Sequence, residues 1–229
     1  MRHGWDGAPL PRGRHNLSAQ AVRSSQRDRL LRAMIGLVGE HGYADTSVPM
    51  VVSAARVSRS SFYALFADKT DCFIAACDEE SSGMLKLMLE AGAEEDWVRA
   101  ARRGMERYLK WWQRHPAFSR AYFVELPAAG SRAVRQRDRQ YARYRKLFAA
   151  LGERARQEQP ELPPLSPLAT RLIVAGITEV VAEEVRAGRI GGLDALADDL
   201  LYLVLRLLAD DATAERAVSK RRLRVASVH

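Results

Sequence analysis

Hydroxyl and basic side chains gather in two short runs in the N-terminal third of the chain. Thr46 and Ser47 form the first run, and Ser58, Arg59, Ser60 and Ser61 form the second. An arginine guanidinium can donate two parallel hydrogen bonds to a guanine, and hydroxyl groups bind phosphate oxygens or base edges. We therefore predict DNA contact by these residues and two that follow, the full set being Thr46, Ser47, Ser58, Arg59, Ser60, Ser61, Tyr63 and Lys69.

The residue types that support catalysis or bind metals show no matching arrangement. The five histidines are spread along the chain, and three of them fall in its expected tails. No spacing of cysteine and histidine fits zinc, and no glycine-rich phosphate loop follows a strand. Glu179, Glu183 and Glu184 lie near Arg186 at the spacing of a salt-bridged helix face, which fits poorly with an acid–base pair. We expect neither an enzyme nor a bound metal or cofactor.

A second group of side chains, rich in aromatic rings, lies in the middle of the chain. Rings and methionine side chains of this kind line pockets for apolar ligands. The same stripe also suits a filled core, and the sequence leaves both interpretations open. The candidate lining residues of a pocket for an unknown, largely apolar small-molecule effector are Trp97, Met105, Tyr108, Trp112, Phe118, Tyr122 and Tyr144.

The two hydroxyl runs belong to two short helices that are joined by a tight turn. Thr46 and Ser47 suit the start of the first helix, and Pro49 fits its first turn because a missing N–H does no harm there. Ser58 suits the start of the second helix, along which Phe62 points inward. Such a pair is a helix-turn-helix, which places its second helix in the major groove. The phosphate contacts are then assigned to Thr46, Ser47, Tyr63 and Lys69.

This segment resembles the DNA-binding signature of the tetracycline-repressor (TetR) family of bacterial transcription regulators, over roughly residues 25–75. Arg56 and Ser60 stand where the family usually has glycine, and Leu65 replaces its common His or Tyr. Arg56 is therefore expected to adopt a positive φ, at a local cost. The matching residues are Gly42, Tyr43, Thr46, Ser47, Val57, Ser58, Phe62, Tyr63, Phe66, Asp68, Lys69 and Asp71.

The resemblance and the helical periodicity together predict an all-α fold. A three-helix N-terminal helix-turn-helix DNA-binding domain is followed by a larger C-terminal helical ligand-binding and dimerisation bundle. The resemblance implies a homodimeric repressor that the effector releases from a palindromic double-stranded DNA operator. The alternative that remains open is a constitutive helical DNA-binding or architectural protein without an effector. The expected parts are a flexible basic arm (1–17), the DNA-binding domain (18–67), the ligand-binding and dimerisation domain (68–211) and a basic tail (212–229).

Two strongly apolar segments near the C-terminus predict the dimer interface. Their leucine, isoleucine and valine residues occupy more than one side of each helix, so each helix is either deeply buried or meets a partner. Contact between two copies would set the recognition helices about 34–36 Å apart, as a palindrome requires. The alternative is that these residues close the core of a single chain. The candidate interface residues are Ile173, Ile177, Val180, Val181, Leu200, Leu201, Val204 and Leu208.

Composition agrees with a polyanionic partner. The 229 residues carry a net charge of +8, and the sequence pI is about 9.9. No apolar run reaches the roughly 18 residues of a membrane span, and no secretory signal is evident, so we expect a cytoplasmic protein without a membrane partner. Cys72 and Cys77 are expected to be reduced thiols because their spacing on one helix fits a disulfide poorly.

Overall fold

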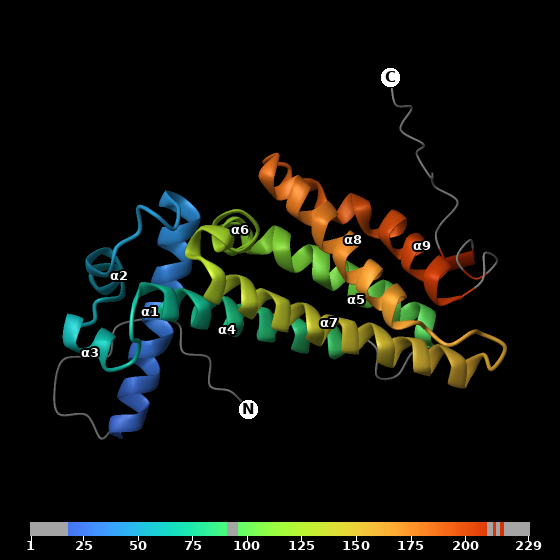
Figure 1. The fold of residues 1–229 in the computed structure, drawn as a ribbon, viewed down its shortest axis with the longest axis horizontal. Coiled ribbons are helices and arrows are strands. Elements are labelled where there is room, and N and C mark those ends of the chain that lie inside the picture. The colour runs from blue at the N-terminus through green and yellow to red at the C-terminus, as the bar shows by residue number, and fades with distance from the viewer. Residues whose placement is uncertain (1–17, 91–95, 210–212, 214–215, 218–229) are drawn as a thin grey trace.

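The computed structural model describes residues 18–90, 96–209, 213 and 216–217, and these residues form helices and turns without a strand. The all-α prediction is therefore confirmed for the described part of the chain. Figure 1 shows three N-terminal helices at one end of an elongated molecule, with a larger bundle beyond them. The expected basic arm (1–17) and most of the expected tail (212–229) lie outside the described residues.

The N-terminal unit consists of α1 (Ala19–His41), α2 (Val48–Ala55) and α3 (Arg59–Tyr63). The Ser58 side chain caps α3 by accepting a hydrogen bond from a backbone N–H, as predicted, and the Ser18 side chain caps α1 in the same way. α1 packs against α2, and Phe62 of α3 is completely buried. These contacts hold the two short helices of the helix-turn-helix on the longer α1.

The turn between α2 and α3 contains a non-glycine residue in the left-handed region, as the sequence predicted. Arg56 has φ 52° and ψ 48°. Arg29 of α1 braces this turn, since its Nη1 donates hydrogen bonds to the carbonyl oxygens of Ala55 (2.9 Å) and Arg56 (3.1 Å). These two hydrogen bonds help to fix the orientation of α3 relative to α2.

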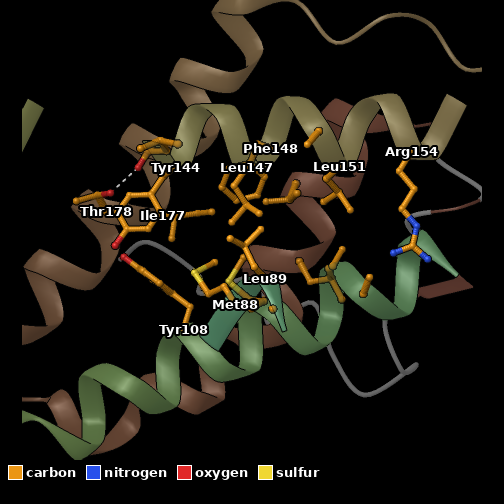
Figure 2. A pocket seen from close by; sticks show the side chains of 18 residues that line it. Met88, Leu89, Tyr108, Tyr144, Leu147, Phe148, Leu151, Arg154, Ile177 and Thr178 are labelled. Atoms are coloured by element: carbon orange, nitrogen blue, oxygen red, sulfur yellow. Dashed lines mark hydrogen bonds between the residues drawn. The ribbon is translucent and has the colours of Figure 1, made fainter. Parts of the chain in front are cut away.

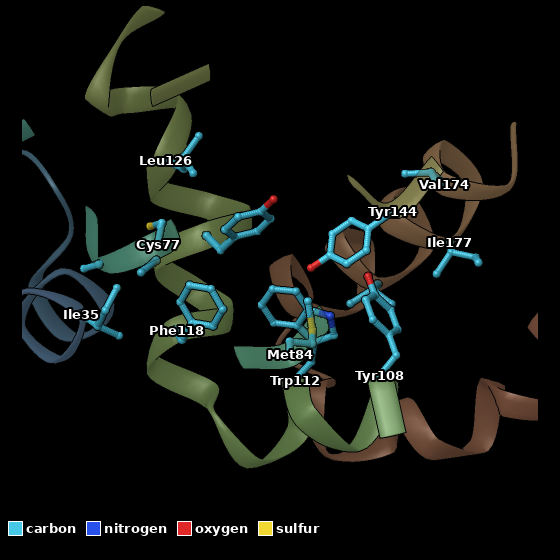
Figure 3. Packing of buried hydrophobic residues seen from close by; sticks show 14 of the residues in the cluster. Ile35, Cys77, Met84, Tyr108, Trp112, Phe118, Leu126, Tyr144, Val174 and Ile177 are labelled. Atoms are coloured by element: carbon cyan, nitrogen blue, oxygen red, sulfur yellow. The ribbon is translucent and has the colours of Figure 1, made fainter. Parts of the chain in front are cut away.

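The larger bundle contains five long helices: α4 (Lys69–Leu89), α5 (Trp97–Arg114), α7 (Ser131–Glu158), α8 (Pro167–Arg186) and α9 (Ala197–Leu208). α4 packs against α1 as well as against α5 and α7, so it joins the two units. Figure 3 shows part of the apolar core, in which Met84, Trp112 and Phe118 come from different segments. All three side chains are almost completely buried.

Two segments depart from the single helices that the sequence suggests. One α-helix over residues 117–126 would be in keeping with the helical sequence pattern, but α6 (Pro116–Arg120) continues into a π-helical segment, Ala121–Glu125, and a 3-10 turn, Leu126–Ala129. Pro127 has no N–H to donate to the preceding turn, so the α-helical pattern cannot continue there. Before α9, the segment Ile190–Leu196 is a 3-10 helix, and Gly191 and Gly192 within it disfavour an α-helix.

The two cysteines are buried free thiols, as expected. Burial raises the pKa of the Cys72 thiol to about 12, so the thiolate is not populated near neutral pH. Among the described residues, none of the helices combines the length and the hydrophobicity that a membrane span requires.

Candidate nucleic-acid interface, ligand cavity and leucine surface

The N-terminus of α3 presents a group of exposed polar side chains. The Ser58 hydroxyl accepts a hydrogen bond from the Ser61 N–H (3.0 Å), and its oxygen lies 2.9 Å from that of Ser60. Arg59 is exposed and lies over the Tyr63 ring, with 5.7 Å between Cζ and the ring centroid, and Tyr63 is 48% exposed. Five of the predicted contact residues thus lie on α3 or at its N-cap, with Arg59 able to extend from the exposed start of the helix.

The Lys69 ammonium is directed toward backbone carbonyl oxygens of the same chain. Its Nζ donates hydrogen bonds to the carbonyl oxygens of Tyr43 (2.7 Å) and Thr46 (2.8 Å), and it lies 4.1 Å from the centroid of the Tyr43 ring. Desolvation by burial is the main cause that lowers the Lys69 pKa. In this structure the Lys69 donors tie the turn before α2 to the start of α4, and its phosphate contact stays a prediction.

Thr46 is also directed inward. Its side chain is 1% exposed, and Oγ1 donates a hydrogen bond of 2.8 Å to the Gly42 carbonyl oxygen. The Thr46 hydroxyl proton is therefore used inside the turn, and the phosphate contact of Thr46 stays a prediction. Ser47 is half-buried and accepts a long hydrogen bond from the Met50 N–H (3.5 Å), so it remains close to the surface at the start of α2.

A cavity of about 260 Å³ lies within the larger bundle, between α4, α5, α7, α8 and α9. Figure 2 shows its lining, with Phe148 and Leu151 on α7 and Met88 and Leu89 from α4. Three of the predicted lining residues, Met105, Tyr108 and Tyr144, do line it. The volume lies close to the lower end of the range of about 300–1,000 Å³ that is typical of ligand pockets.

The other four predicted lining residues do not line this cavity. Trp112 stacks on Phe118 with 5.1 Å between ring centroids, and lies 5.4 Å from Tyr122. Trp97 is 1% exposed and packs in the core near the start of α5. These rings fill the space between helices because aromatic side chains bury a large area when they pack edge or face against each other.

Most of the cavity lining comes from small and aliphatic residues that were not among the predicted ones. A signal was present in α5, where small residues recur at one side of the helix and leave space beside it. The assignment of the opposing residues required the relative registers of five helices, which the sequence does not give. The missed lining residues are Met88, Leu89, Ala100, Ala101, Gly104, Leu147, Phe148, Ala150, Leu151, Arg154, Val174, Ile177, Thr178, Leu201 and Val204.

The predicted dimer residues are mostly buried within the single chain. Seven of the eight are at most 8% exposed, and Val180 is half-buried. Those seven help to close the core of the chain itself, and their role in an interface stays a prediction. A different set of leucines faces outward, two on α8 and two on α9. We call this set the leucine surface: Leu168, Leu172, Leu203 and Leu207, with exposed fractions of 60%, 55%, 59% and 45%.

The fold and these sites define an all-α protein with an N-terminal helix-turn-helix and a cavity-bearing helical bundle. Residues 30–76 match the family model described as bacterial regulatory proteins, tetR family. The chain thus resembles TetR-family transcriptional regulators in the sequence of its helix-turn-helix segment.

Solved structures of similar fold agree with this resemblance. The fatty acid degradation regulator FadR from Bacillus halodurans superposes with a TM-score of 0.71 at 20% identity, over 79% of this chain and 94% of that chain. FadR from Bacillus subtilis in complex with stearoyl-CoA has a TM-score of 0.69 at 17% identity, over 80% of this chain and 98% of that chain. A TetR-like transcriptional regulator from Rhodococcus sp. RHA1 has a TM-score of 0.61 at 23% identity, over 80% of this chain and 95% of that chain. No curated protein sequence matches the chain at a significant level.

Proposed function

We propose that the protein is a homodimeric transcriptional repressor that binds a palindromic operator and leaves it when a largely apolar small molecule binds. The observation that carries this proposal is the exposed end of α3, with Arg59 at its tip, within a segment that matches the tetR family model. In a helix-turn-helix protein this helix end contacts base edges in the major groove.

The proposed DNA contacts follow from exposure and chemistry. Arg59 supplies the bidentate guanine contact, while Ser60 and Ser61 lie beside it at the start of α3. Tyr63 and Ser47 reach phosphates and set the register of the helix on the duplex. Thr46 and Lys69 hold the turn that positions α2 and do not themselves contact DNA.

The proposed dimer uses the leucine surface. Leu168 and Leu172 are four residues apart on α8, and Leu203 and Leu207 are four residues apart on α9, so each pair lies on one helix side. α8 and α9 pack against each other and run along one edge of the bundle (Figure 1). A second copy covers this apolar surface, and the resulting two-fold axis matches a palindromic operator.

The cavity supports the proposal that an effector controls DNA binding. The similar fold of FadR from Bacillus subtilis has been determined in complex with stearoyl-CoA, so a bundle of this kind can hold a ligand. A cavity lined mainly by apolar side chains favours an effector over the constitutive alternative, which needs only a filled core.

Selection of binding sites from a random DNA library tests the proposal. We expect the wild-type protein to enrich a palindrome, and Arg59→Ala to relax the preference at one base of each half-site. Such a loss corresponds to about 1–3 kcal/mol of discrimination. Ser53→Ala, which changes an exposed residue of α2, serves as the control. Failure of the wild-type protein to enrich any sequence above background would reject a sequence-specific regulator.

A further inference from the structure

One end of the cavity carries polar groups that a purely apolar effector would leave unused. Tyr108 of α5, Tyr144 of α7 and Thr178 of α8 lie together at that end, and Arg154 lies at the opposite end (Figure 2). The Tyr108 and Tyr144 side chains are each 7% exposed. Three helices thus bring hydroxyl groups to a single apolar space.

The Tyr144 hydroxyl has no hydrogen-bond partner among the described residues, although it is buried. Figures 2 and 3 show the Tyr144 and Tyr108 hydroxyls directed toward the same small region. Thr178 cannot serve as a free donor there, since its Oγ1 donates a hydrogen bond of 2.6 Å to the Val174 carbonyl oxygen. Buried polar groups in folded proteins nearly always have a partner, so an unpaired phenol at a cavity wall points to a ligand atom.

The electrostatic character of this end favours a neutral ligand group. Of the eighteen described residues that line the cavity, Arg154 is the charged one, and it is ion-paired with Glu158 (2.9 Å) at the far end. Burial raises the pKa of the Tyr108 and Tyr144 phenols, so both remain protonated donors. An anion placed between them would lose its hydration without gaining a cation.

We propose that the Tyr108 and Tyr144 hydroxyls form a subsite for a neutral carbonyl oxygen, of a ketone or an ester, on an otherwise apolar effector. This inference rests on the proposed role of the cavity as the effector site. The apolar body of the ligand extends from the subsite between Met105, Phe148 and Leu151. Tyr144 is the specificity-determining residue, because its hydroxyl is available to the ligand without the loss of an existing bond.

Displacement of a fluorescent apolar probe tests the subsite. N-phenylnaphthylamine is bound to the full-length protein and displaced by methyl heptyl ketone or by nonanoate, two competitors with the same number of carbon atoms. We expect the probe to bind wild type and Tyr144→Phe equally, and the ketone to displace it about three- to tenfold less effectively from Tyr144→Phe, as one neutral hydrogen bond predicts. Tyr202→Phe, on α9 and absent from the cavity lining, serves as the control and should behave as wild type.

The outcomes separate this inference from the proposed function. Equal displacement by the ketone from wild type and Tyr144→Phe overturns the subsite and leaves the cavity as an effector site. If nonanoate binds more tightly than the ketone and its binding depends on Tyr144, the proposal that the ligand group is a neutral carbonyl is wrong. Failure of the probe to bind wild type overturns the effector cavity itself, together with the subsite. The melting temperature of ligand-free Tyr144→Phe should not fall, and a clear decrease would show that the hydroxyl already has a partner within the protein.

Discussion

The backbone N–H of Tyr43 donates a hydrogen bond of 2.9 Å to the Glu125 carboxylate. Tyr43 lies in the turn between α1 and α2, and Glu125 ends the π-helical segment Ala121–Glu125, so the bond joins the helix-turn-helix unit to the larger bundle. The Glu125 side chain is only 15% exposed, and Arg120 lies 3.7 Å from its carboxylate.

Aromatic contacts lead from the cavity toward this bond. The Tyr108 ring at the cavity wall meets the Trp112 ring edge-on, with 6.0 Å between centroids. Trp112 in turn lies 5.4 Å from the ring of Tyr122, which belongs to the same π-helical segment as Glu125. Packed rings thus join Tyr108 at the cavity wall to the segment whose Glu125 holds the turn before α2.

Replacement of Glu125 by alanine should weaken both the fold and the effector response. We expect a decrease of about 1–3 kcal/mol in the free energy of unfolding, because the Tyr43 N–H loses a charged acceptor. Chemical denaturation measures the first effect, and operator binding with and without effector measures the second. Glu125→Gln keeps an acceptor oxygen and should retain most of the stability and most of the effector response. An unchanged effector response in Glu125→Ala would show that the signal does not pass through this bond.

Replacement of Lys69 by methionine should reduce operator affinity without changing its salt dependence. The Lys69 ammonium binds carbonyl oxygens of the Tyr43–Thr46 turn, so its loss disturbs the position of α2 and removes no phosphate contact. A lost phosphate contact would instead lower the slope of log affinity against log salt by about one. Fluorescence anisotropy over a range of salt concentrations measures this slope, and a decrease by one would restore Lys69 as a phosphate ligand.

Charge on the leucine surface should separate the dimer without unfolding the chain. Leu172 and Leu203 are more than half exposed, so the Leu172→Glu, Leu203→Glu variant should be a folded monomer at micromolar concentration. Leu201 is 1% exposed, so Leu201→Glu should instead lose cooperative folding, because it buries an unpaired charge. Sedimentation and circular dichroism distinguish the two cases. If the leucine-surface variant stayed dimeric, the interface would have to lie elsewhere on the chain.

Stability should depend on the charge of Asp68 at low pH. The Asp71 N–H is the main cause that lowers the Asp68 pKa, and Arg132, at 2.9 Å, lowers it further. A carboxyl whose pKa is lower in the folded state stabilises above its unfolded value of about 3.9, and this contribution is lost as pH falls through the folded value.

Asp68→Ala removes the acceptor of the Asp71 N–H at the start of α4. It should therefore lower the free energy of unfolding by about 1 kcal/mol at pH 7, as the loss of a helix N-cap does, and by clearly less near pH 2. Urea unfolding at both pH values measures the difference, and Asp68→Asn, which keeps a capping oxygen, should cost less at pH 7. A cost for Asp68→Ala that is constant with pH would show that the charge plays no part.

Local sequence patterns predicted the helix-turn-helix closely. Ser58 caps α3, and Arg56 adopts the left-handed conformation at the turn, because each of these features depends on residues only a few positions apart. The direction of individual side chains was harder to predict. Lys69 suits a phosphate by its type and position, yet its ammonium reaches carbonyl oxygens more than twenty residues away in the chain.

The sequence by itself determined that the chain is helical, where its helix-turn-helix lies and that its last helices are strongly apolar, because periodicity and capping are local properties. Only the tertiary structure decided which apolar residues face inward. Helix rotation about its own axis is set by packing against all neighbours at once, so Leu201 is buried while Leu203 is exposed. The same packing placed Tyr144 on the cavity wall and Trp112 in the filled core, although both looked alike as pocket candidates in the sequence.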